Sequence, residues 1–144
     1  MRPLQLLVVT HDQRLLKRLI TATSAARAIQ ICGWVSAAEE LAATTDIESL
    51  DIALIDFDMP LWASVGAIRL LFTQTPTVQI MAVFSAANTA EAMSAVRAGA
   101  NACLLKEGQS GAQMTQALQA LAAGSSTISP EIARQLVNAI RQPH

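Results

Sequence analysis

The chain has 144 residues, a formal net charge of −1 and two cysteines, which suits one domain whose core needs no disulfides. The small net charge and the scarcity of basic clusters argue against direct binding of nucleic acid. No apolar run approaches the roughly 18 residues of a membrane helix, and the run after Pro3 is too short for a signal peptide. We therefore expect a cytoplasmic protein with no membrane contact.

Short apolar runs alternate with longer amphipathic segments along the chain. The runs predict strands at residues 4–9, 29–35, 51–56, 78–84 and 101–105. Helices are expected at residues 12–24, 37–43, 62–74, 89–98 and 110–123. The strand runs are continuously apolar, which is typical of parallel strands covered on both faces. The alternation predicts right-handed crossovers and an α/β fold with a doubly wound, five-stranded parallel sheet.

A further helix is predicted after Gly124. Ser129 is placed to cap it, and Pro130 suits its first turn. Its apolar stripe consists of Ile132, Leu136, Val137 and Ile140. The helix either packs onto the same domain or acts as a linker or partner-binding helix.

The two cysteines indicate a reducing compartment. Cys32 and Cys103 each lie within an apolar stretch and form neither a CxxC motif nor a secretory pattern. We expect both side chains in the core.

Polar residues follow three of the predicted strands, where ligands of such sheets bind. Asp56 ends the third strand, Ser85 follows the fourth and Lys106 follows the fifth. Together they suit an acyl-phosphate site, with Asp56 as the nucleophile and the hydroxyl and ammonium groups holding phosphoryl oxygens. The alternative is that Asp56 and Lys106 form a structural ion pair.

Two motifs carry a resemblance to a known family. The sequences "ALIDFDMP" at 53–60 and "VRAGANACLLKE" at 96–107, with the order of elements, resemble the receiver domain of two-component response regulators. The resemblance implies a flavodoxin-like fold with strand order 2-1-3-4-5 and no enzymatic activity. It also implies that Asp56 is the phosphoacceptor and that Ser85 and Lys106 bind the phosphoryl group.

The tail "ALQALAAGSSTISPEIARQL" at 117–136 resembles the segment that joins the receiver to a helix-turn-helix domain in NarL/FixJ-type transcriptional regulators. The resemblance divides the chain into a receiver domain at 1–124 and a linker helix at 125–144. DNA contact is therefore expected only through a downstream domain that this chain does not contain.

The acidic pocket departs from the family pattern. Members present two adjacent acidic residues after the first strand, which hold Mg²⁺ together with the phosphoacceptor; here these positions are Thr10 and His11. Asp12, one residue beyond, is placed to cap the first helix. Because Mg²⁺ prefers several hard oxygen ligands, Asp56 with the backbone near Asp58 predicts weak or absent metal binding.

The charge count supports the same interpretation. Asp56 would face Lys106 and a titratable His11, so the pocket would be neutral without a cation. Phosphoryl transfer relies on a metal or fixed positive charge. Phosphorylation of Asp56 is therefore expected to be slow.

One further departure concerns output. Cys103 takes the place of an aromatic residue that in the family swings inward on phosphorylation, and a thiol is too small for that role. Trp62 is either an anchor for a partner or an aromatic that closes the mouth of the pocket.

We interpret the chain as an atypical receiver that regulates transcription through protein contacts. The resemblance implies a homodimer through the helix at 89–98, the strand at 101–105 and the helix at 110–123, and a histidine kinase or another regulatory protein as partner. One alternative is a conventional phosphorylatable receiver in which Asp12 reaches the metal. Others are a site for a small anion at Lys106, His11 and Ser85, or a transition-metal site at His11, Asp12 and Asp56.

Overall fold

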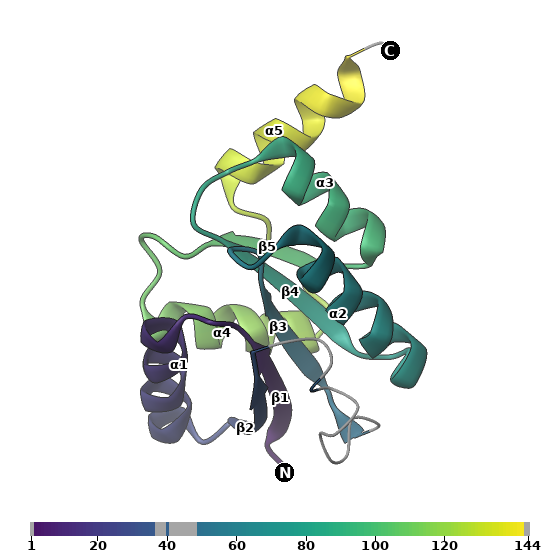
Figure 1. Ribbon diagram of the computed structural model, residues 1–144. Helices are drawn as coiled ribbons and strands as arrows, with labels where there is room; N and C mark the ends of the chain where they lie inside the picture. The colour runs from purple at the N-terminus through teal and green to yellow at the C-terminus, as the bar shows by residue number, and fades with distance from the viewer. Residues whose placement is uncertain (1, 37–39, 41–48, 143–144) are drawn as a thin grey trace.

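The computed structural model describes residues 2–36, 40 and 49–142 (Figure 1). The strands are β1 (Leu4–Val9), β2 (Ile29–Val35), β3 (Ile52–Asp56), β4 (Gln79–Phe84) and β5 (Ala102–Leu105). The helices are α1 (Gln13–Ala26), α2 (Leu61–Gln74), α3 (Thr89–Ala98), α4 (Gly111–Ala122) and α5 (Pro130–Arg141). The helix predicted at 37–43 lies outside the described residues except for residue 40. None of the described helices is long and apolar enough to cross a membrane.

The five strands form one parallel sheet in the order β2-β1-β3-β4-β5. This confirms the predicted fold class and the flavodoxin-like strand order. Because all strands run the same way, their carboxyl ends meet at one edge of the sheet, and residues that follow them are brought together there.

Helices cover both faces of the sheet, as Figure 1 shows. Successive strand residues point to opposite faces, so Leu6 and Val8 join one core while Leu7 and Val9 join the other. The first core is completed by apolar residues of α1 and α4, and the second by residues of α2, α3 and α5. The continuous apolar runs of β1, β3 and β4 are explained by this double coverage.

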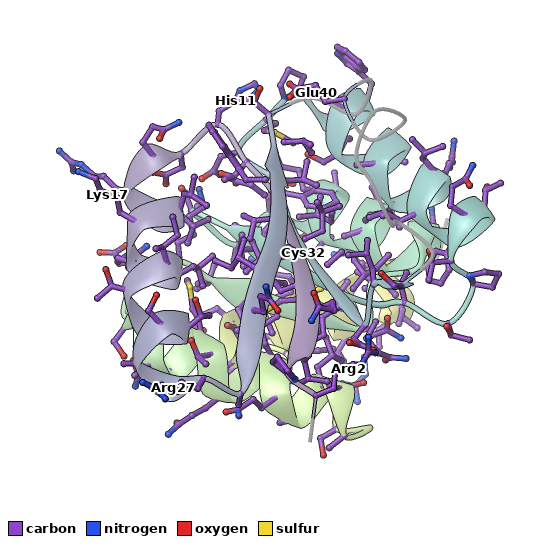
Figure 2. All side chains as sticks on the ribbon, turned by 90° about the horizontal axis from the view of Figure 1, so that it is seen from below. Arg2, His11, Lys17, Arg27, Cys32 and Glu40 are labelled. Atoms are coloured by element: carbon purple, nitrogen blue, oxygen red, sulfur yellow. The ribbon has the colours of Figure 1, made fainter. Side chains whose placement is uncertain are left out.

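Strand β2 differs because it lies at an edge of the sheet. Its burial alternates along the strand, and Cys32 is exposed on it (Figure 2). The prediction that both cysteines lie in the core is therefore wrong for Cys32 and confirmed for Cys103, which is 1% exposed. Burial raises the pKa of Cys103 to about 11, so this side chain stays a neutral thiol at physiological pH.

The segment before α5 lies alongside β5. The backbone N–H of Cys103 donates to the carbonyl of Thr127 (2.9 Å), and the N–H of Ser129 donates to the carbonyl of Cys103 (2.8 Å). Ser129 is the residue before α5, as predicted, but its hydroxyl accepts a hydrogen bond from the N–H of Leu105 (3.0 Å) instead of capping the helix. The free edge of β5 is thus occupied by the chain itself.

Helix α5 packs onto the domain, which is one of the two alternatives that the sequence left open. Ile132 and Leu136 are buried in the core, and the hydroxyl of Thr89 on α3 donates to the side chain of Gln135. Val137 and Ile140, at the other end of the stripe, are 46% and 74% exposed. Helix α5 contacts α3 and β5, so it covers part of the face expected to form a dimer.

Two glycines provide a matched test of this packing. Gly66 lies inside α2, where an added Cβ would have no atom within 4 Å, whereas a Cβ on Gly99 would lie 1.9 Å from Cε2 of Phe72 at a φ of +126°. Gly66→Ala should raise the free energy of unfolding by about 0.5–1 kcal/mol, since alanine favours helices. Gly99→Ala should lower it by about 2 kcal/mol or more. Urea denaturation measures both, and a Gly99→Ala protein as stable as the unchanged chain would contradict the packing.

Candidate functional site

Six polar residues gather at the carboxyl edge of the sheet. Thr10 follows β1, Asp56 ends β3 and Lys106 follows β5. Asp12 and Asp58 lie a few residues beyond the ends of β1 and β3, and Ser85 follows β4. We call Asp12, Asp56, Asp58 and Lys106 the carboxylate–lysine cluster.

Asp56 is the buried centre of this cluster. It is 1% exposed, and its Oδ2 lies 2.8 Å from Nζ of Lys106, which confirms the predicted ion pair. The hydroxyl of Thr10 donates to the same oxygen (2.5 Å), and the backbone N–H of Asp58 donates to Oδ1 (2.8 Å). Both carboxylate oxygens of Asp56 are therefore engaged by donors of the protein.

Lys106 contacts three carboxylates at once. Its Nζ lies 2.8 Å from Asp56, 2.8 Å from Asp58 and 3.2 Å from Asp12. Burial lowers the pKa of Lys106, but the hydrogen bonds and charges of these carboxylates outweigh burial and hold the pKa above its ordinary value. The lysine is therefore charged at physiological pH.

The pKa values of the two outer carboxyls move the other way. Partial burial raises the pKa of Asp12 and Asp58, yet hydrogen bonds leave both pKa values below the ordinary 3.8. For Asp12 the largest lowering cause is the N–H of Leu15, followed by Lys106; for Asp58 it is Lys106, followed by Ser85. Both outer carboxyl groups are thus supplied with donors that favour the charged form.

The predicted neutrality of the pocket is wrong. The prediction set Asp56 against Lys106 and His11, but His11 is exposed at the turn between β1 and α1 (Figure 2) and forms no ion pair or hydrogen bond with the described residues. Asp12 and Asp58 are present instead. Three carboxylates therefore share one lysine, and the cluster carries excess negative charge.

Ser85 and Cys103 lie apart from Asp56 in this structure. The hydroxyl of Ser85 donates to Oδ2 of Asp58, and its N–H donates to Oδ1 of the same side chain (3.1 Å). Cys103 belongs to the core beneath α3 and α5, with no hydrogen bond to the cluster among the described residues. Any part that either residue takes in binding a phosphoryl group requires a rearrangement.

Sequence reasoning missed three supporting contacts. Asp12 caps α1 as predicted, accepting from the N–H groups of Arg14 and Leu15, but it also pairs with Lys106. The buried hydroxyl of Ser64 donates to the carbonyl of Asp56 (2.8 Å), and Nε1 of Trp34 donates to the carbonyl of Thr10 (3.1 Å). In the sequence, the run "THD" at 10–12 gives the one indication of this second contact. Asp12 is acidic and lies one position beyond Thr10 and His11, where the family has its two acidic residues.

The donors present do not fit a magnesium ion well. Among the described residues, no group of three or more histidine, cysteine, aspartate or glutamate side chains is arranged to hold a metal. Asp56 and Asp58 are the nearest candidates, but Lys106 lies against both. The hydroxyl of Thr10 is neutral and donates a hydrogen bond to Asp56. Mg²⁺ is bound most readily by charged carboxylate oxygens, so Thr10 is a weaker ligand than an acidic residue at this position.

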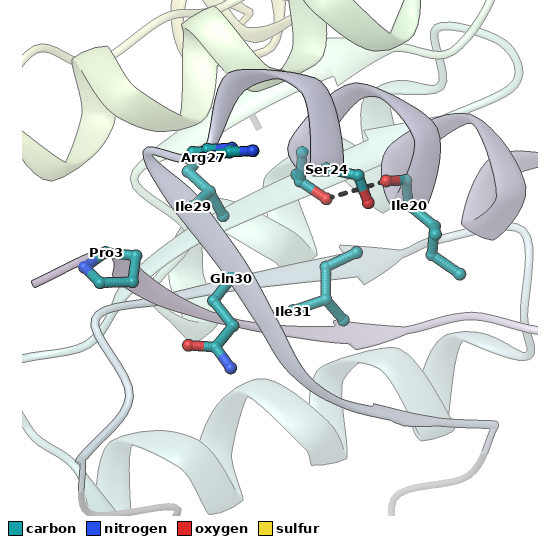
Figure 3. Close-up of a pocket in the computed structure, with 8 residues that line it drawn as sticks. Pro3, Ile20, Ser24, Arg27, Ile29, Gln30 and Ile31 are labelled. Carbon is teal, nitrogen blue, oxygen red and sulfur yellow. Dashed lines mark hydrogen bonds between the residues drawn. The ribbon is translucent and has the colours of Figure 1, made fainter.

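A hollow of about 770 Å³ opens beside the cluster and is lined by Asp12, Arg14, Lys17, Arg18, Ser85, Lys106, Glu107 and Gly108. A second hollow, of about 490 Å³, lies between α1 and β2 at the amino end of the strands (Figure 3). Its lining contains Arg27 and several aliphatic side chains but no carboxylate. Of these two hollows, the one at the carboxyl edge of the sheet is therefore the one beside the clustered carboxylates and lysine.

Removing the lysine tests the energetics of the cluster. Lys106→Met should lower the free energy of unfolding by about 3 kcal/mol at pH 7, because it leaves buried Asp56 without its cation. The lowered pKa values of Asp12 and Asp58 contribute stability that is present above the unfolded value of 3.8 and is lost as the pH falls through the folded values. The difference between the two proteins should thus shrink as the pH falls from about 5 to about 3.

Chemical denaturation at about pH 7, 5 and 3 measures this difference. The double variant Asp56→Asn, Lys106→Met is the control, and it should recover part of the lost stability because neither charge remains. A difference that stays constant over this pH range would contradict the role assigned to these carboxylates.

Solved structures resemble the chain over nearly all of its length. A LuxR-family two-component response regulator from Aurantimonas sp. SI85-9A1 superposes with a TM-score of 0.78 at 20% identity, covering 97% of this chain and 99% of that one. RcsB of Salmonella typhimurium gives a TM-score of 0.78 at 16% identity, covering 95% of this chain and 67% of RcsB. The receiver domain assigned to NarL of Mycobacterium tuberculosis gives 0.72 at 18% identity, covering 87% and 100%.

These identities establish the fold alone, and no curated protein matches the chain. The family model described as the response regulator receiver domain, however, matches residues 6–121. Receiver domains are signalling modules. The sequence motifs, the sheet order and this match agree, and the chain belongs to the response regulator receiver domain family.

Proposed function

We propose that the chain is an atypical receiver of a NarL/FixJ-type response regulator, with weak or no Mg²⁺-dependent phosphorylation at Asp56. The observation that carries the proposal is the engagement of both oxygens of Asp56, one by the hydroxyl of Thr10 and by Lys106, the other by the N–H of Asp58. A carboxylate that accepts three donors is a poor nucleophile, because its lone pairs must leave these partners before attack.

Each of the candidate site residues has its own role in this proposal. Asp56 is the phosphoacceptor position, and Lys106 holds its charge in place of a metal. Ser85 reaches a phosphoryl group only after it leaves Asp58, with which it forms two hydrogen bonds. Cys103 replaces the switching aromatic and stays in the core, so output does not depend on the swing of a large ring.

Contacts with other proteins then carry the signal. We infer a cytoplasmic homodimer that responds to a histidine kinase or another regulatory protein, with residues 1–124 as the receiver and 125–144 as the linker helix. The related RcsB is described as dimers bound to DNA, which supports transcription as the output.

One observation favours a second candidate, a conventional phosphorylatable receiver. Asp12 and Asp58 both lie against Lys106, so displacement of the lysine would release carboxylates that can accept a cation. The hollow beside the cluster also contains Arg14, Lys17 and Arg18, a lining that suits a small anion. The following experiment separates these candidates from the proposal.

The melting temperature of the unchanged chain should be nearly the same with and without millimolar Mg²⁺. The double variant Thr10→Asp, His11→Asp should melt lower without Mg²⁺, because a carboxylate at position 10 would meet Oδ2 of Asp56 where the hydroxyl now donates. Mg²⁺ should restore its stability. Its labelling by acetyl phosphate, followed by intact-protein mass, should exceed that of the unchanged chain.

Two variants control the experiment. His11→Asp alone should leave the melting temperature without Mg²⁺ almost unchanged, since His11 is exposed, and adding Asp56→Asn to the double variant should abolish labelling. If the unchanged chain gains several degrees with Mg²⁺ and is labelled at Asp56, the conventional receiver is correct. Stabilisation by inorganic phosphate without Mg²⁺ would favour the anion site.

Dimerisation should not depend on a phosphodonor. Because α5 covers part of the expected face, we expect the exposed end of its stripe, at Val137 and Ile140, to contact the second copy. Ile140→Asp should shift the chain towards monomer in sedimentation equilibrium, whereas Ile20→Asp, at a residue 46% exposed on α1, should not. A chain that is monomeric until acetyl phosphate and Mg²⁺ are added would contradict this proposal.

A further inference from the structure

A second surface, distinct from the carboxylate–lysine cluster, lies between α2 and α3. It is a hollow of about 400 Å³ lined by Leu61, Trp62, Val65, Arg69, Ser94, Arg97 and Ala98. Trp62 is 69% exposed and Leu61 is 39% exposed. A large aromatic side chain held this far out on the first turn of a helix loses most of the benefit of burial.

The hollow does not belong to the phosphoacceptor site. None of its lining residues lines the hollow beside the cluster, so Trp62 does not close the mouth of that pocket. This placement favours the anchor for a partner over the other interpretation that the sequence left open for Trp62.

Two arginines give the hollow its charge. Arg69 on α2 and Arg97 on α3 are exposed, and neither guanidinium forms an ion pair or hydrogen bond with the residues that the structure describes. Glu91 is the one acidic residue on these two helices, and it lies at the other end of α3, where burial and then the charge of Asp58 raise its pKa. Two cations therefore face this hollow with no carboxylate among its lining residues.

We propose that the hollow between α2 and α3 binds an acidic segment of a partner protein that inserts an apolar side chain against Trp62. Leu61 and Val65 line the same hollow as Trp62, so an apolar side chain bound there would find apolar contacts. The two guanidinium groups can each bind a carboxylate in bidentate geometry. Exposed tryptophan and arginine are the residue types that dominate binding energy at protein interfaces.

A protein segment fits better than a nucleic acid. Binding of a nucleic acid is dominated by contacts between several cations and the phosphate backbone, whereas this hollow offers two arginines and the whole chain has a net charge of −1. The aliphatic neighbours of Trp62 also favour an apolar side chain over a stacked base.

A display library of random peptides, each about 12 residues long, selected on the full chain, tests the proposal. We expect enrichment of peptides in which two or more acidic residues flank an aromatic or aliphatic one. The most enriched peptide, synthesised and titrated, should bind at least about tenfold more weakly to Trp62→Ala and to Arg97→Glu. Its affinity should also fall as the salt concentration rises.

Matched variants away from the hollow control for a general loss of apolar or positive surface. Ile20→Ala on α1 and Arg134→Glu on α5, neither of which lines the hollow, should change the affinity by less than about twofold. None of these variants touches the carboxylate–lysine cluster, so this test stands whether or not the phosphoacceptor proposal is correct. Thermal melting checks that each variant is folded.

Three outcomes would overturn the proposal. They are a selection that enriches no acidic and apolar peptides, an enriched peptide that binds Trp62→Ala and Arg97→Glu as well as the unchanged chain, and binding of single-stranded poly-dT that is lost in Trp62→Ala. The last would assign the surface to a nucleic acid.

Discussion

The ion pair between Asp56 and Lys106 is the constraint on which the site depends. A carboxylate that is 1% exposed can stay charged only if donors replace the water it has lost. Asp56 comes from β3, Lys106 from the end of β5 and Thr10 from the end of β1, so the pair requires the strand order that the parallel sheet provides. The aromatic pair of Phe57 and Phe84, with ring centroids 5.0 Å apart, packs the core directly beneath this edge.

The charges around Lys106 explain why the residue at position 10 matters for the surroundings of Asp56. With a carboxylate at position 10, Asp56 would have a like charge where it now accepts a hydrogen bond, and an added cation would relieve the repulsion. With Thr10, the hydroxyl donates a hydrogen bond to the Asp56 carboxylate instead. The excess negative charge is moved outward to Asp12 and Asp58, which are partly solvated, so that water screens it.

Sequence patterns predicted the fold well because each strand is covered on both faces and reads as a continuous apolar run. They failed for Cys32, since the run that contains it forms an edge strand whose alternate side chains are exposed. The pair of Asp56 and Lys106 could be predicted from the parallel topology. The positions of the His11 and Asp12 side chains could not, because the turn after β1 decides which of these two neighbours faces Lys106. Ser129 was placed correctly, but its hydroxyl bonds to β5, a long-range partner that no local pattern encodes.

The same long-range contacts suggest how the site communicates with α5. Lys106 directly follows β5, the N–H of Leu105 donates to the hydroxyl of Ser129, and Cys103 exchanges backbone hydrogen bonds with residues 127–129. A shift of Lys106 away from the carboxylates would therefore act on the same short strand that holds the start of α5. Since Cys103 is small and buried, a coupling of this kind would pass through the backbone of β5. Under the proposal that Cys103 stands in place of a switching aromatic, such a route from the cluster to the terminal helix needs no vacant space in the core.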